Sequence, residues 1–250
     1  MNIVLEVQHL GRAFGGLKAV DDVSFQVAEG QVLSIIGPNG AGKTTLFNLI
    51  TGAIAPDAGD VRFLGRSIRG LPPFRTARLG IGRTFQIVRP FPALSVRQNL
   101  QVAALARPAS AATRAERVEQ ALSLTGLASF ADAPARSLTL AMRKRLELAR
   151  AMALHPRVIL LDEVMAGLNP TEVDEIVRLI RELGSLGIAA VAGVEHVMRA
   201  VLSISDRVVV LNYGRKIAEG SPADVVSNPE VIRAYLGTSY TQTLVQKEAQ

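Results

Sequence analysis

One short segment constrains this chain more than any other. Residues 37–44 read Gly-Pro-Asn-Gly-Ala-Gly-Lys-Thr, which fits the pattern G-x-x-x-x-G-K-[ST]. An apolar run at 32–36 precedes the segment, and a helical pattern from Thr45 to Ile50 follows it. Glycines let backbone amides surround phosphate oxygens, and the next helix points its positive end at the same anion. A chance glycine-rich turn would lack this strand–loop–helix context, so the segment predicts a nucleotide-phosphate site.

Each part of this loop has an expected role. Lys43 would neutralise charge on the β- and γ-phosphates, and the Thr44 hydroxyl would ligate magnesium. The predicted cofactors are therefore ATP and Mg²⁺. The residues expected to hold the nucleotide are Gly37, Pro38, Asn39, Gly40, Ala41, Gly42, Lys43, Thr44 and Thr45.

A second segment ends an apolar run in two carboxylates. Residues 158–161 read Val-Ile-Leu-Leu, and Asp162 and Glu163 follow directly. A buried strand tip is a costly place for charge unless a cation is nearby. We therefore expect Asp162 to hold the magnesium shell and Glu163 to polarise the attacking water as general base. The alternative is an acidic pair at a helix N-terminus.

Composition narrows the class of protein. The chain has 250 residues, of which 48% are hydrophobic and 20% charged, a globular balance with one sizeable core. Without cysteine it has no disulfide and no thiolate metal site. The net charge of +6 favours anionic partners, but only 4% of residues are aromatic, so nucleic acid is not expected. No secretory signal is visible, and the weakly polar stretch 186–194 is too short for a membrane span.

The order of apolar runs predicts an α/β fold. Runs at 32–36, 158–161, 188–194 and 208–211 are typical of buried, mostly parallel strands. Two alternating runs, 3–7 and 23–27, predict an antiparallel edge sheet. Cap residues predict helix starts at Ser95, Thr113, Asn169, Ser221 and Asn228.

The chain is expected to form one nucleotide-binding domain, residues 1–237, with a polar tail at 238–250. Between 87 and 155 Ala, Leu and Arg dominate, which predicts a helical subdomain inserted into a catalytic core formed by 1–86 and 156–237.

From about Leu5 to Gly237 the two motifs and their surroundings resemble the nucleotide-binding subunits of ABC transporters, which are P-loop NTPases of RecA-like fold. The resemblance implies three further contacts. Gln86, in Arg-Thr-Phe-Gln at 83–86, would sense magnesium and water, as in the family's Q-loop. His196, in Val-Glu-His-Val-Met at 194–198, would touch the γ-phosphate, and Phe14 would stack on adenine. Taken singly, His196 and Phe14 are equally typical of packed core residues.

Residues 14–20, 83–86 and 228–237 look like branched-chain amino acid importers, whose relatives also handle urea or short amides. This similarity implies an ATPase that drives uptake from the cytoplasmic face of the cell membrane. Its partners would be a second ABC ATPase subunit, two transmembrane permease subunits and an extracytoplasmic solute-binding protein. The alternatives are an exporter or a lipid-extraction ATPase. A soluble ABC protein acting on nucleic acid is disfavoured, because such proteins resemble two fused halves or carry coiled-coil insertions.

One departure from the family is at its signature, Leu-Ser-Gly-Gly-Gln, which reads Leu-Thr-Leu-Ala-Met at 138–142. Thr139 keeps a hydroxyl for the γ-phosphate of ATP held by the opposite subunit, whereas Ala141 replaces the glycine that would approach it most closely. We therefore expect the signature to donate only weak hydrogen bonds to the ATP held by the opposite subunit. In a heterodimer, which we favour, one of the two ATP sites would be weakened, and in a homodimer both would be. In the extreme case the chain would be a catalytically weakened partner subunit. Arg143, Lys144 and Arg145 follow, and we interpret them as a solvated helix face.

Overall fold

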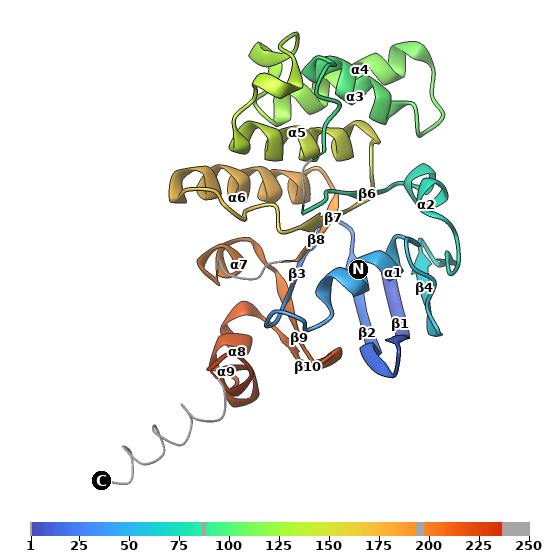
Figure 1. The fold of residues 1–250 in the computed structure, drawn as a ribbon, viewed down its shortest axis with the longest axis vertical. Coiled ribbons are helices and arrows are strands. Elements are labelled where there is room, and N and C mark those ends of the chain that lie inside the picture. The colour runs from blue at the N-terminus through green and yellow to red at the C-terminus, as the bar shows by residue number, and fades with distance from the viewer. Residues whose placement is uncertain (1, 87–88, 194–197, 237–250) are drawn as a thin grey trace.

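The computed structural model describes residues 2–86, 89–193 and 198–236. Two sheets and the helices around them make up the fold (Figure 1). The larger sheet has six strands in the order β10-β9-β3-β8-β7-β6. Its members are β3 (Val32–Ile36), β6 (Ile81–Arg83), β7 (Val158–Asp162), β8 (Ala189–Gly193), β9 (Arg207–Asn212) and β10 (Arg215–Gly220).

The larger sheet is parallel from β6 to β9, and only β10 is antiparallel. A second sheet of order β2-β1-β4-β5 is antiparallel throughout. Its strands are β1 (Ile3–Phe14), β2 (Leu17–Ala28), β4 (Ala58–Phe63) and β5 (Arg66–Ser67). The expected α/β fold, a mostly parallel sheet with an antiparallel companion, is confirmed.

The central strands are mainly apolar because both of their faces are buried. Successive side chains of a strand point to opposite faces. In β3, Val32 and Ile36 join the core formed with the helices, whereas Leu33 and Ile35 join the core formed with α1 and the antiparallel sheet.

Helices cover the sheets and extend the molecule at one end, where α3, α4 and α5 pack on one another (Figure 1). Among the described residues, no helix combines the length and the hydrophobicity that crossing a bilayer requires. The helices are α1 (Lys43–Ile50), α2 (Pro73–Leu79), α3 (Val96–Ala104), α4 (Ala111–Leu124), α5 (Leu140–Ala153), α6 (Pro170–Ser185), α7 (Met198–Ile204), α8 (Pro222–Ser227) and α9 (Pro229–Leu236).

Four of the five predicted helix starts are correct, and one is wrong by one turn. Ser95, Asn169 and Ser221 form capping boxes, and α9 begins directly after Asn228. The cap of α4 is Ser110 rather than Thr113, because the Ser110 hydroxyl accepts from the Thr113 amide at 3.1 Å. Thr113 thus lies inside the first turn of α4.

Strand ends determine where the chemistry lies. The loop after β3, Arg83 at the end of β6, and Asp162 at the end of β7 all leave the carboxyl edge of the parallel sheet. Asp162 is paired in register with Gly193, the last residue of β8. In open α/β sheets this edge is where ligands bind.

Candidate nucleotide-binding and active site

The loop between β3 and α1 follows a path that only glycine allows at two points. A Cβ on Gly37 would overlap the carbonyl oxygen of Leu211, and a Cβ on Gly42 would overlap that of Ala19. Gly42 also has φ 103° and is the residue from which α1 begins. The loop is therefore held tightly against neighbouring strands, with its amides and the helix N-terminus available to an anion.

A cavity of about 210 Å³ opens beside this loop, lined by residues 17–19, 40–45 and Tyr213. The buried Lys43 donates its Nζ to the carbonyls of Gly37 at 2.7 Å and Pro38 at 3.0 Å. Thr44, by contrast, is exposed, and so is Asn39. The backbone amides and the absence of a Cβ atom at Gly37, Gly40 and Gly42 fit a phosphate chain, with the Thr44 hydroxyl open to a metal ion.

Asp162 is buried at the tip of β7 and is paired with a cation of the protein itself. Arg83 Nη2 lies 2.9 Å from Asp162 Oδ2, with both side chains buried. Arg83 Nη1 also donates to Asn48 Oδ1 at 2.7 Å and to Thr51 Oγ1 at 3.1 Å. A buried carboxylate at a strand tip requires a nearby cation, and Arg83 supplies one. Arg83 was named from the sequence only as the first residue of the segment 83–86, and this contact was not predicted.

Glu163 and Gln86 lie together. Gln86 Nε2 donates to Glu163 Oε2 at 2.7 Å, although 77 positions separate them in sequence. Glu163 has φ 48°, an unusual conformation for a residue with a side chain, and its amide donates to the Gly193 carbonyl at 3.1 Å. Backbone strain of this kind persists where surrounding structure fixes it and clusters at functional sites.

Lys144 corrects the interpretation of residues 143–145 as a solvated face. Its side chain is buried, and Nζ donates to the carbonyls of Glu163 at 3.0 Å and Gln86 at 3.4 Å. Burial lowers the pKa of Lys144, and the carboxylates of Glu163, Asp162 and Glu147 oppose that shift. Helical periodicity does not reveal this role, because the two carbonyls come from distant segments.

The altered signature forms the start of α5. Thr139 is the helix cap, and its Oγ1 accepts from the Met142 amide at 3.3 Å. Ala141 lies in the first turn, where the backbone is helical, so its methyl group adds bulk and no strain. Neither residue lines the P-loop cavity, so a single chain does not bring them to its own nucleotide site.

Two aromatic side chains lie near the P-loop or its neighbouring strands, and only one of them lines the cavity. Phe14 ends β1 with 44% of its surface exposed and the Arg12 guanidinium 5.0 Å from its ring centre, and it does not line the cavity. Tyr213, which the sequence did not single out, does line it and is 85% exposed. A hydrogen bond of 3.0 Å from the Gly214 amide to the Ala41 carbonyl ties this turn to the loop. His196 lies outside the described residues.

The glycine loop, its buried lysine and the acidic strand tip define a P-loop nucleotide-binding protein. The sequence matches the ABC transporter family over residues 20–166, and a branched-chain amino acid ATP-binding cassette transporter family over residues 215–241. The chain belongs to the ABC transporter family.

Known relatives agree. The chain is 44% identical to the high-affinity branched-chain amino acid transport ATP-binding protein BraF of Pseudomonas aeruginosa, over 94% of this chain and 98% of BraF. It is 40% identical to the lipopolysaccharide export system ATP-binding protein LptB of Acidithiobacillus ferridurans, over 96% of this chain and 99% of LptB. The crystal structure of the ADP conformation of MJ1267, an ATP-binding cassette of an ABC transporter, superimposes with a TM-score of 0.86 at 31% identity, covering 95% of this chain and 100% of that one.

These findings confirm the expected function. The chain binds nucleotide and is the ATPase subunit of an ABC importer, and as such works within a membrane transporter complex. The export alternative is less supported, because the family matched at 215–241 is an amino acid transporter family.

Proposed function

We propose that the chain hydrolyses MgATP at the edge of its parallel sheet to drive uptake of branched-chain amino acids or related small solutes. The observation that carries the chemistry is the contact between Gln86 and Glu163, beside a carboxylate that Arg83 fixes in place. Glu163 would act as general base on the attacking water. Thr44, Gln86 and Asp162 would hold Mg²⁺, which supplies charge neutralisation at the phosphates. His196 and Phe14 keep their expected roles at the γ-phosphate and adenine.

We also propose the assembly expected from the sequence. A second ABC ATPase subunit would place its signature on the nucleotide held here, because Thr139 and Ala141 do not line the cavity of their own chain. Two membrane permease subunits, an extracytoplasmic solute-binding protein and a location on the inner face of the membrane complete the proposal. Residues 87–155 would be the helical subdomain and residues 238–250 a tail.

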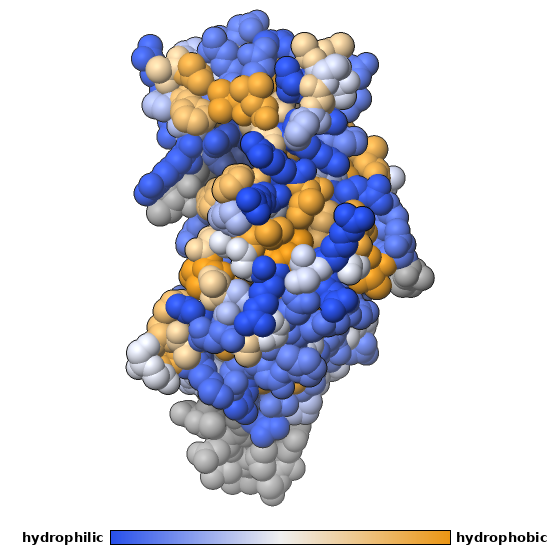
Figure 2. Space-filling model, turned by 90° about the vertical axis from the view of Figure 1, so that its right-hand side faces the viewer, coloured by the Kyte–Doolittle hydropathy of each residue, from blue (hydrophilic) through white to orange (hydrophobic). Residues whose placement is uncertain are grey.

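Exposed apolar side chains support docking of a membrane subunit. Phe74 and Leu79 on α2 are exposed, and so are Phe85 and Phe91 on either side of the segment around Gln86. Figure 2 shows, on the side of the molecule that carries α2, apolar patches separated by hydrophilic residues. Such patches rimmed by polar residues are typical of protein interaction sites.

Two variants test the chemistry. In the assembled transporter, Glu163→Gln is expected to lower ATP turnover by roughly a hundredfold or more while ATP still binds. Lys43→Ala is expected to weaken magnesium-dependent ATP binding itself. Equal turnover in Glu163→Gln and the unchanged protein would favour the catalytically weakened partner, and full ATP affinity in Lys43→Ala would refute the proposed site.

The similarity to LptB makes lipopolysaccharide export the second candidate. Purification with the membrane subunits encoded alongside this chain distinguishes the two. Solute-stimulated ATPase activity with a binding protein supports import, and stimulation by lipid supports export.

A further inference from the structure

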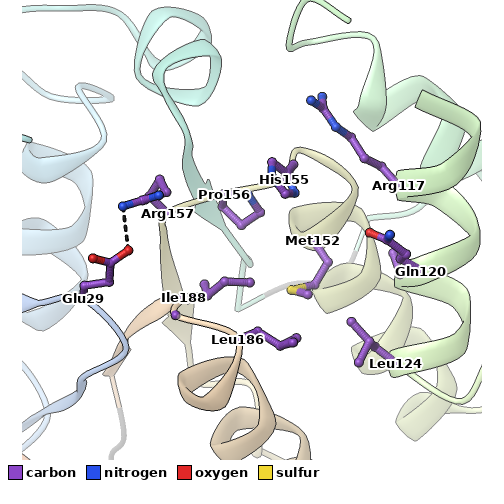
Figure 3. Close-up of a pocket in the computed structure, with 12 residues that line it drawn as sticks. Glu29, Arg117, Gln120, Leu124, Met152, His155, Pro156, Arg157, Leu186 and Ile188 are labelled. Atoms are coloured by element: carbon purple, nitrogen blue, oxygen red, sulfur yellow. Dashed lines mark hydrogen bonds and ion pairs between the residues drawn. The ribbon is translucent and has the colours of Figure 1, made fainter. Parts of the chain in front are cut away.

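A second cavity lies at the opposite edge of the parallel sheet from the P-loop. It has a volume of about 230 Å³ and is lined by α4, by the chain leaving α5, by the turn after α6 and by Glu29 (Figure 3). Strands β7 and β8 begin beside it, whereas their other ends carry Asp162 and Gly193 at the nucleotide site. We call this cavity the α4–α5 pocket.

Positive charge gathers around this pocket. Burial lowers the pKa of His155, and the charges of Arg117, Arg107 and Arg157 lower it further, so three guanidinium groups act on one imidazole. Arg157 is paired with Glu29 at 2.6 Å, and the second oxygen of Glu29 accepts from Asn2 at 3.2 Å. The one carboxylate lining the pocket is thus already engaged, which leaves Arg107 and Arg117 as surplus cations.

The donors of these arginines are unequally used. Arg107 donates to the carbonyl of His155 at the end of α5, where the helix dipole favours a cation. Arg117 Nη1, in contrast, is buried and has no hydrogen-bond partner within the part of the chain that the structure describes. A buried donor without an acceptor is costly, so this atom favours an anionic ligand.

Apart from Gln120, the rest of the pocket wall is apolar. Leu124, Met152, Leu186 and Ile188 gather on one side, and His155 and Arg117 lie on the other (Figure 3). The volume is below the 300–1,000 Å³ typical of drug-sized ligand sites, and together with the apolar wall it suits a molecule of a few carbon atoms.

We propose that the α4–α5 pocket binds a small aliphatic carboxylate, with the carboxylate on Arg117 and the hydrocarbon chain against Leu124, Met152 and Leu186. Branched-chain amino acids and the 2-oxo acids derived from them share this chemistry.

Helix α5 gives the pocket a route to the active site. Met152 lines the pocket near one end of this helix, and Lys144, two turns earlier, donates to the Glu163 carbonyl. A ligand that shifts α5 would therefore move the support of the general base. This step rests on the proposed function, since the ligand would then report the transported solute or its product to the ATPase.

Calorimetric titration of the purified full chain tests binding without any transport assay, and the P-loop is saturated with MgADP beforehand so that this anion site does not take up the titrant. We expect 4-methyl-2-oxopentanoate to bind, and L-leucinamide, which lacks the carboxylate, and inorganic phosphate, which lacks the hydrocarbon chain, to bind at least roughly tenfold more weakly. L-leucine compared with the oxo acid shows whether an ammonium group is accepted beside the arginines.

Matched variants locate the site. Arg117→Gln is expected to weaken oxo-acid binding by roughly tenfold or more, and Arg178→Gln, an exposed arginine on α6, to leave it unchanged. Leu186→Ser, at a side chain 54% exposed, should weaken oxo-acid binding without unfolding the protein. ATP affinity should stay the same in all three variants. A negative result for the α4–α5 pocket can therefore be told apart from a negative result for the ATP site, which Lys43→Ala tests.

Three results would overturn the inference: no binding at millimolar concentrations, phosphate binding as tight as that of the oxo acid, or equal affinity in Arg117→Gln and Arg178→Gln. Binding that leaves ATP turnover in the assembled transporter unchanged would overturn the link through α5.

Discussion

At the scale of single residues, two buried cations organise the acidic tip of β7 in different ways. Arg83 reaches the carboxylate of Asp162, whereas Lys144 reaches the main-chain carbonyl of Glu163. The first sets the charge balance at the expected metal ligand. The second supports a backbone with φ 48°, so it holds the proposed general base in position in addition to facing its charge.

Lys144→Met tests this positioning role. It removes the donor from two carbonyls and leaves them buried, which costs roughly 1–3 kcal/mol and should lower ATP turnover roughly tenfold. ATP affinity is expected to change little, because Lys144 does not line the P-loop cavity. Steady-state turnover and equilibrium nucleotide binding separate the two effects, and Lys144→Arg, which keeps a donor, should recover part of the activity. A parallel loss of affinity and turnover would instead indicate a general structural defect.

Ala141→Gly tests the altered signature. Removing the methyl group from the first turn of α5 lets the amide approach a phosphate held by the partner subunit. A charge-assisted hydrogen bond of roughly 1.5–3 kcal/mol would raise turnover of the assembled complex about tenfold or more.

Glycine also loosens a helix, by about 1 kcal/mol relative to alanine. Ala115→Gly, at an exposed position of α4, is the control for that effect. An unchanged rate in Ala141→Gly would show that the signature imposes no handicap.

At the scale of elements, the sequence pattern predicted the strands and helix starts that are determined by residues close together in the chain. The strands around 32–36, 158–162 and 207–212 were found because both faces are buried, so each is built around a short, mainly apolar run. The cap of α4 was misplaced because Ser110 and Thr113 both suit a helix start, and only Ser110 accepts a hydrogen bond from the first turn.

The same distinction separates the site residues that the sequence predicted from those that it did not. The loop at 37–44 and the pair Asp162–Glu163 are contiguous motifs, and sequence alone located them. Arg83 meets Asp162 across 79 positions and Lys144 meets Gln86 across 58, so only the folded sheet brings them together. Tyr213 reaches the cavity for the same reason, through a turn between β9 and β10 that packs on the loop.

Gly37→Ala tests how tightly the loop is held between its elements. The new Cβ would overlap the Leu211 carbonyl, so the β3–α1 connection would have to move away from β9. We expect a loss of about 3 kcal/mol or more in the free energy of unfolding, together with loss of ATP binding.

Gly65→Ala is the matched control, because Gly65 has φ 75° with open space around it. It should cost only about 1–2 kcal/mol for the left-handed backbone and leave ATP binding intact. Similar losses in the two variants, measured by denaturant unfolding, would show that the loop has room to relax.

At the scale of the whole molecule, the nucleotide site and the expected membrane contact meet in one segment. Arg83, Phe85 and Gln86 are neighbours in sequence, yet Arg83 is buried on Asp162, Gln86 touches Glu163, and Phe85 is 56% exposed. The Arg83 guanidinium lies 5.0 Å from the centre of the Phe85 ring. A force on this ring from outside therefore reaches the acidic strand tip through a single residue.

Phe85→Ala should separate docking from chemistry. The ring is an exposed aromatic of the kind that anchors interfaces, where truncation commonly costs about 2 kcal/mol or more, so the affinity for permease subunits should fall by roughly thirtyfold or more and their retention during purification should fall with it. ATP affinity of the isolated chain should be unchanged, because Phe85 does not line the P-loop cavity. Leu202→Ala on α7, at a side chain 45% exposed, controls for loss of any surface apolar group. If both variants retain the permease subunits equally well, the membrane subunits dock elsewhere, and the stacking of Arg83 on Phe85 serves only to hold Asp162.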